Sequence, residues 1–135
     1  QDLSRNGNAK WIDELKRRLD LGSLWNHSAK AISGGQARRI ALARMLARRP
    51  PLILLDEPFT ALDRPTMNEL IDTLLEWHST LGFSLIVVDH RAEVLEKLCT
   101  SVAAIEAGSF IQQGRWSELA AAPATPLLAR LLTAR

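Results

Sequence analysis

The stretch that decides the fold begins with Ile32-Ser33-Gly34-Gly35-Gln36 and continues, after an arginine-rich segment, to Leu52-Ile53-Leu54-Leu55-Asp56-Glu57-Pro58. The first run places two glycines where a helix is expected to begin, directly after a serine that favours helix N-termini. The second run is a short apolar strand that ends in two adjacent carboxylates. Because ligands of open α/β sheets bind beyond the carboxyl ends of the strands, this stretch predicts an α/β fold with a ligand site.

The hydrophobic pattern around this stretch alternates between helices and short apolar strands. Helices are expected at residues 10–21, 34–49, 65–80, 91–98, 116–122 and 126–133. Strands are expected at residues 52–55, 85–88 and 102–105, with a short antiparallel strand near residues 110–113. Residues 1–9 are expected to be loose, Gly22 to end the first helix, and residues 27–31 to form a loop. Continuous apolar strands joined by a helix predict a parallel sheet covered on both faces.

Composition and charge exclude several classes of protein. The 135 residues are 47% hydrophobic and 24% charged, which is typical of one soluble domain with a core. Net charge is +2, and the arginines of residues 38–49 spread around more than half of the expected helix, which argues against nucleic-acid binding. Cys99 is the only cysteine, so no internal disulfide forms, which suits the cytoplasm. No apolar run reaches the ~20 residues that span a bilayer.

The glycine run combines a capping signal with a feature that capping does not explain. Ser33 and Gln36 have the spacing of a capping box, in which each side chain bonds the other residue's backbone. Gly34 and Gly35 each cost a helix about 1 kcal/mol relative to alanine. They are explained if a ligand lies against bare backbone, where exposed N–H groups and the helix dipole bind an anion. We therefore favour a phosphate site over a plain cap.

The carboxylates belong to a second predicted group. Asp56 and Glu57 follow one strand and His90 follows the next, so the topology is expected to bring all three to one sheet edge. Adjacent carboxylates repel each other unless a cation such as Mg²⁺ neutralises them or the two side chains take separate roles. Asp63 is expected both to cap the helix that opens at Pro65 and to contact a partner.

Residues 32–63, ISGGQARRIALARMLARRPPLILLDEPFTALD, resemble the core of the ATP-binding cassette (ABC) ATPases. Signature motif, signature helix, Walker B motif and D-loop occur in the family's order, and His90 matches the switch histidine. The resemblance covers most of the chain, and residues 114–119 look like the ends of prokaryotic importer ATPases. It implies a partial, three-layer P-loop NTPase-like fold, with a mostly parallel sheet flanked by helices. Residues 1–49 would be part of an α-helical subdomain and 50–135 the C-terminal part of the RecA-like core.

The resemblance also implies a mechanism in which two cassettes sandwich ATP. Residues of the signature motif would contact the nucleotide held by the opposite cassette: Ser33, Gly34, Gly35 and Gln36. Asp56 would hold Mg²⁺ directly or through water, and Glu57 would polarise the attacking water. His90 would contact the γ-phosphate and orient that water, and Asp63 would couple the two sites across the dimer.

The chain departs from the family pattern in three places. Ile32 replaces the usual leucine, which is conservative. Asp89 stands where serine or threonine is usual and Arg91 where an acid is usual, and both are expected to alter the field at His90. None of the seven glycines precedes a lysine, so the sequence contains no P-loop. The chain therefore resembles the C-terminal half of a cassette and is not expected, alone, to bind ATP tightly or hydrolyse it.

The leading hypothesis is an importer ATPase subunit that pairs with a second nucleotide-binding domain and with transmembrane permease subunits. Its location would be cytoplasmic, on the inner face of the cell membrane. One alternative is a soluble ABC ATPase of DNA repair or translation. Another is a truncated cassette that acts as a non-enzymatic interaction or regulatory module.

Overall fold

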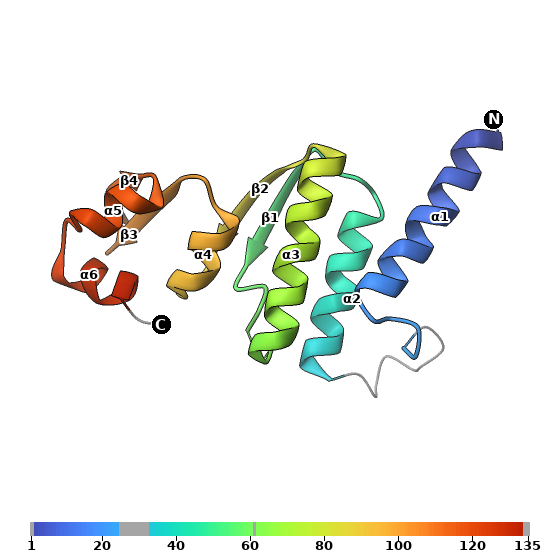
Figure 1. Ribbon diagram of the computed structural model, residues 1–135, viewed down its shortest axis with the longest axis horizontal. Helices are drawn as coiled ribbons and strands as arrows, with labels where there is room; N and C mark the ends of the chain where they lie inside the picture. Colours follow the sequence, from blue (N-terminus) through green and yellow to red (C-terminus); the bar gives the residue numbers. More distant parts are fainter. Residues whose placement is uncertain (1, 25–32, 61, 134–135) are drawn as a thin grey trace. The chain divides into compact units, whose positions relative to one another are not determined.

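A computed structural model describes residues 2–24, 33–60 and 62–133, and it has the predicted α/β architecture (Figure 1). The helices are α1 (Asp2–Arg18), α2 (Gly34–Leu46), α3 (Arg64–Leu81), α4 (Ala92–Leu98), α5 (Trp116–Ala121) and α6 (Pro126–Thr133). The strands are β1 (Leu52–Asp56), β2 (Ser84–Val88), β3 (Val102–Glu106) and β4 (Ser109–Gly114). Ile32 and the loop predicted at residues 27–31 lie outside the described residues. None of the described helices combines the length and apolar character needed to cross a bilayer.

The chain forms two compact units. The first contains residues 1–53 and 59–85, and the second contains residues 54–58 and 86–135. These units do not follow the boundary at residues 49 and 50 that the resemblance implies for the subdomains, and the assignment of subdomains stays a prediction.

Helix α1 is present where a helix was predicted, but its two ends differ from the prediction. It begins at Asp2 rather than Lys10, because the polar segment before Lys10 contains no proline and its single glycine costs a helix only about 1 kcal/mol. At the other end Asp20 has a φ of 50°, and the Leu21 N–H donates to the Lys16 carbonyl at 2.8 Å. This is the hydrogen-bond pattern of a Schellman motif, so Asp20, not Gly22, terminates the helix.

Trp11 ties the three helices of the first unit together. Its indole Nε1 donates to the carbonyl of Leu46, at the end of α2, at 3.0 Å. Its ring meets the ring of Trp77 on α3 edge-on, with centroids 5.3 Å apart, and the Arg49 guanidinium lies 5.3 Å from the Trp11 centroid. The buried tryptophan therefore satisfies its polar atom and contacts both neighbouring helices.

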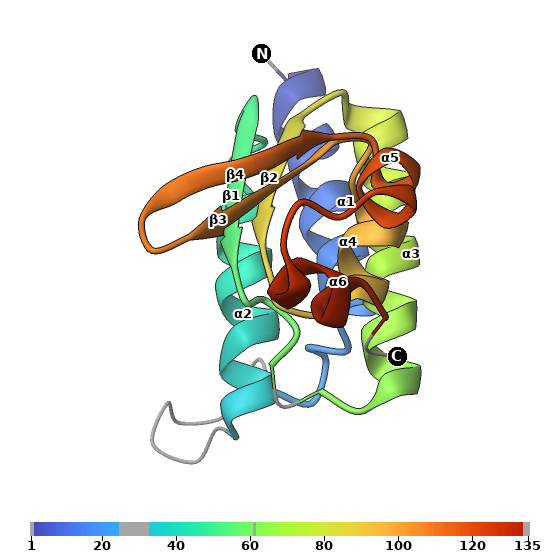
Figure 2. The same cartoon turned by 90° about the vertical axis from the view of Figure 1, so that its left-hand side faces the viewer.

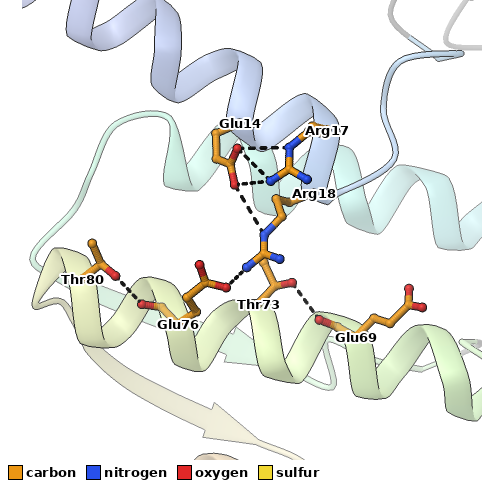
Figure 3. A network of polar contacts seen from close by, with 7 residues as sticks. All are labelled: Glu14, Arg17, Arg18, Glu69, Thr73, Glu76 and Thr80. Atoms are coloured by element: carbon orange, nitrogen blue, oxygen red, sulfur yellow. Dashed lines mark hydrogen bonds and ion pairs between the residues drawn. The ribbon is translucent and has the colours of Figure 1, made fainter.

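An ion-pair network joins α1 to α3 at the surface (Figure 3). Glu14 pairs with Arg17 at 2.8 Å and with Arg18 at 3.5 Å, and Arg18 also pairs with Glu76 on α3. Ion pairs near the surface contribute only about 0–1 kcal/mol each, so this network adds little to stability.

Strands β1 and β2 are parallel and are joined by α3. The Ser84 N–H donates to the Pro51 carbonyl and the Glu57 N–H to the Val88 carbonyl, each at 2.8 Å, so both strands run the same way. Gly82, with a φ of 70°, caps α3 at its C-terminus. The predicted βαβ unit is therefore present, and its crossover helix ends just before the second strand.

One face of these strands differs from the prediction. Ile53 is fully buried, but Leu54, Ile86 and Val88 are 65%, 53% and 59% exposed. The apolar runs predicted strands covered on both faces, and no described element covers these three side chains. These apolar side chains therefore lie on a face of the strands that the described residues leave exposed.

Strands β3 and β4 form an antiparallel hairpin, whose strands run alongside each other in Figure 2. Ala107 and Gly108 both have positive φ, 49° and 78°, which is the backbone of a two-residue type I′ turn. Among the described strands, these two pair with each other and not with β1 or β2. The side chain of Gln112 then bonds the backbone of Ala122 and Ala124, which fixes the segment between α5 and α6.

Candidate active site

Five residues where β1 and β2 end form a polar group, here called the strand-end cluster: Asp56, Glu57, Asp89, His90 and Arg91. Glu57 follows β1 directly and has a φ of 42°, a left-handed backbone that is uncommon for a residue other than glycine. Its N–H still donates to the Val88 carbonyl at 2.8 Å. Pairing with β2 therefore holds Glu57 in a conformation that turns the chain out of the strand.

Glu57 and His90 lie together, as the topology predicts. The Nδ1 atom of His90 is 3.3 Å from Oε1 of Glu57, and the side chains are 64% and 50% exposed respectively. The ring nitrogen Nε2 lies on the opposite side of the imidazole. A histidine whose Nδ1 faces a carboxylate keeps Nε2 for a ligand or for a proton transfer.

Asp89 and Arg91 bind each other, a contact that the sequence did not predict. The Asp89 side chain is fully buried and accepts bonds from Arg91 Nε at 3.0 Å, Nη2 at 2.7 Å and the backbone N–H at 2.9 Å. Burial by itself would raise the pKa of the Asp89 carboxyl, but the hydrogen bonds and charge of Arg91 lower that pKa below its usual value. Asp89 is therefore a buried, neutralised carboxylate. The signal available in the sequence was the opposite charge of the residues on either side of His90.

Asp56 offers a single exposed carboxylate at the end of β1. Within the described residues, no group of three or more His, Cys, Asp and Glu side chains is arranged to hold a metal ion. This donor set does not make a closed site for zinc. It fits Mg²⁺, which is usually held by one or two carboxylates together with waters and substrate phosphates.

The second candidate group is the signature turn, residues 33–36, in the first compact unit. The Ser33 N–H donates to Gln36 Oε1 at 2.9 Å, and the Gln36 N–H donates to Ser33 Oγ at 3.3 Å. The predicted capping box is therefore confirmed. The two bonds fix the first turn of α2 without help from the rest of the chain.

Neither glycine of the signature turn has the left-handed backbone that favours glycine. A Cβ added to Gly34 would have no described atom within 4 Å, and one added to Gly35 would lie 3.3 Å from Leu62 Cδ2. Packing therefore gives a reason for Gly35 but none for Gly34. Bare backbone at Gly34 is consistent with a ligand that approaches the N-terminus of α2.

The segment before α3 contacts the signature helix. Arg38 Nη1 donates to the carbonyl of Thr60, a contact across the first unit that the sequence did not predict. Asp63 occupies the predicted N-cap position of α3, although its side chain makes no capping hydrogen bond among the described residues. The extended backbone of Asp63 and the proline at the start of α3 begin the helix without it. Ala61 lies outside the described residues.

The chain is similar to known ATP-binding proteins. A family model described as "ABC transporter" matches residues 2–60. The methionine import ATP-binding proteins MetN of Escherichia coli O157:H7 and of Shigella flexneri serotype 5b (strain 8401) are each 34% identical over 127 residues. Those matches cover 89% of this chain and 37% of each relative.

The fold has a solved counterpart in the ADP conformation of MJ1267, an ATP-binding cassette of an ABC transporter. That crystal structure superimposes with a TM-score of 0.71, over 96% of this chain and 51% of the other, at 20% identity. At that identity the likeness concerns the fold alone. The chain thus spans little more than a third of the curated relatives it matches and about half of this structure.

Proposed function

Since the chain belongs to the family of ATP-binding cassette ATPases, we propose that it is part of an importer's ATP-binding subunit, where it contributes to ATP hydrolysis. The observation that carries the proposal is the contact of Glu57 with His90, 3.3 Å apart at the carboxyl ends of two parallel strands. A carboxylate and an imidazole at this edge can orient and activate a water for attack on a phosphate.

Each residue of the strand-end cluster has a distinct role in this proposal. Glu57 polarises the attacking water, and His90 uses Nε2 to contact the γ-phosphate and orient that water. Asp56 would hold Mg²⁺ directly or through a water, and the ion would supply positive charge to the phosphates. Phosphoryl transfer depends mainly on positioning and charge neutralisation, which are what these side chains provide.

The signature turn serves the nucleotide of a second cassette. Ser33, Gly34 and Gly35 present the N-terminal backbone of α2 to a γ-phosphate, and the capping box with Gln36 holds that backbone in place. Asp63, whose side chain is not used in capping, is available to couple the two sites across the dimer. The sequence contains no P-loop, so these 135 residues do not themselves supply that phosphate cradle for the strand-end cluster.

The proposed partners are a second nucleotide-binding domain and transmembrane permease subunits, with the complex on the cytoplasmic face of the membrane. The support is that the relatives are named as import ATP-binding proteins. Those relatives are named for methionine import, and we propose a small solute as the cargo here. Purification of the intact protein from membranes is expected to recover a membrane subunit. Recovery with nucleic acid instead would favour the soluble alternative.

Replacement of Glu57 tests the catalytic assignment. In the intact protein, Glu57→Gln keeps the shape of the side chain but removes the charge that polarises water. We expect ATP turnover to fall by about 10²–10⁴-fold while ATP binding and the ATP-bound dimer persist. Glu96→Gln, an exposed position on α4, is the matched control and should retain turnover. Undiminished ATP hydrolysis by Glu57→Gln would contradict the assignment of Glu57 as the residue that polarises the attacking water.

A further inference from the structure

The residues on either side of His90 are fixed by each other. Arg91 donates to Asp89 through Nε, Nη2 and the backbone N–H, at 3.0, 2.7 and 2.9 Å. The side chain of Asp89 is completely buried, and that of Arg91 is 23% exposed. Two parallel bonds between a planar guanidinium and a carboxylate fix orientation as well as distance. The backbone on both sides of His90 is therefore held by one bidentate pair.

His90 itself is held much more weakly than its neighbours. Its side chain is 64% exposed, and its ion-pair contacts are with Glu57 at 3.3 Å and with Asp89 at 4.0 Å. Two carboxylates thus lie within reach of the same ring nitrogen, Nδ1. Arg91 occupies both oxygens of Asp89, since Nε bonds Oδ1 and Nη2 bonds Oδ2. With Asp89 engaged in this way, Nδ1 of His90 lies closer to Glu57 than to Asp89.

The backbone before His90 is fixed from the other strand. The Val88 carbonyl accepts the N–H of Glu57 at 2.8 Å, so the residue that precedes the pair is bonded to the residue that His90 faces. The pair of Asp89 and Arg91, this bond and the contact of His90 with Glu57 close a small ring of interactions at the strand ends. The bonds of Arg91 to Asp89 join the residues on either side of His90 in this group.

We propose that Asp89 and Arg91 are positioning residues, which hold His90 against Glu57 and keep its Nδ1 closer to Glu57 than to Asp89. This proposal rests on the proposed function, because it assigns the pair a role in the hydrolysis carried out by Glu57 and His90. It also explains why two residues that depart from the family pattern occur together. The acid before His90 requires the arginine after it, since an unpaired Asp89 would compete with Glu57 for the same nitrogen.

The test compares three variants of the pair in the intact protein, purified with its membrane partner. Arg91→Gln leaves Asp89 free to attract His90, and we expect kcat for ATP to fall about 10- to 100-fold with KM within a factor of about two. Arg91→Lys keeps the positive charge but loses the planar guanidinium that binds both oxygens of Asp89. Its kcat should lie between those of Arg91→Gln and the parent. The double variant Asp89→Asn with Arg91→Gln removes the competing carboxylate and should recover most of the lost kcat.

The matched control is Arg18→Gln. Arg18 is buried to a similar degree, with 26% exposure, and pairs with Glu14 and Glu76 in the network of Figure 3. It lies in the other compact unit, so its loss should leave kcat unchanged. Thermal unfolding of every variant shows that the rates are measured on folded protein.

Two outcomes would overturn the proposal. One is an Arg91→Gln protein with the parent's kcat, and the other is a double variant no faster than Arg91→Gln. Crystal structures of the intact parent and Arg91→Gln proteins provide a readout that does not need turnover. The contact between His90 Nδ1 and Glu57 Oε1 should be lost in Arg91→Gln and kept in the parent. If the parent hydrolyses no ATP, the proposed function fails, and the structures alone decide whether the pair positions His90.

Discussion

The signature turn at residues 33–36 is held by hydrogen bonds within four residues, whereas the strand-end cluster is held by bonds between strands that α3 separates. Ser33 and Gln36 bond each other's backbone, and nothing beyond α2 is needed for that geometry. Glu57 is fixed through Val88, and His90 lies between two residues that bond each other. The difference teaches that the turn keeps its shape when the rest of the chain changes, and the cluster does not.

Replacement of His90 is the most direct test of the strand-end cluster. We expect His90→Ala to lower ATP turnover of the intact protein on the order of 10³-fold, because it removes a group that orients the attacking water. Binding of ATP should remain. His78→Ala is the control, since His78 lies on α3 against the ring of Phe83, at 5.6 Å between centroids, and belongs to the first unit. Equal rates for the parent and His90→Ala would show that the cluster is not the site of chemistry.

Substitution of Gly34 tests the signature turn. The expected loss of turnover is about tenfold smaller than that for His90→Ala. Gly34→Asp places a negative charge where a γ-phosphate is proposed to bind, and turnover should fall roughly 10²-fold, as when an enzyme loses one oxyanion donor. Folding should be preserved, because a Cβ there meets no described atom within 4 Å and an acid is favourable at a helix N-terminus. Steady-state turnover and thermal unfolding measure the two effects separately.

The control for this variant is Gly22→Asp, at another position where a Cβ meets no described atom within 4 Å. It lies outside the signature turn and should retain turnover. If Gly34→Asp lost stability instead of turnover, the glycine would be a structural requirement and not a ligand contact.

The smallest expected effect is the dependence of stability on pH. The pKa of Asp89 is lower in the folded state than its usual value of about 3.8, which also approximates the unfolded chain. Its ionised form therefore contributes stability that is present above that value and is lost as the pH falls through the lower, folded-state pKa. Denaturant unfolding between about pH 7 and pH 3 should show this loss in the parent but not in Asp89→Asn. A constant difference between the two proteins across this range would contradict the prediction.

The two regions also differ in how far the sequence predicted them. The capping box of Ser33 and Gln36 and the crossover helix were both predicted from spacing and confirmed. The meeting of Glu57 and His90 was predicted as well, because parallel strands end at the same sheet edge. The bond between Asp89 and Arg91 was not predicted. The sequence showed two unusual residues, and only their side-chain geometry shows that they neutralise each other.

The ends of α1 and the exposed side chains of β1 also could not be predicted from the sequence. Gly22 was a reasonable helix stop, but Asp20 adopts the left-handed conformation first, since aspartate tolerates it better than most residues. The apolar runs at Leu54 and Ile86 predicted burial on both faces, yet these side chains are exposed in the part of the chain that the structure describes. The hydrophobicity of a side chain indicates that it favours burial. It does not indicate which segment will bury it.

The sequence by itself determined the order of helices and strands, the capped glycine turn and the family, because these depend on bonds and periodicities within a few residues. Only the tertiary structure decided which polar groups act together. The burial of Asp89 under Arg91, the pairing of His90 with Glu57 and the contacts of Trp11 with α2 and α3 join residues through space. Their energies depend on distance and burial, and a sequence fixes neither until the strands have paired and the helices have packed.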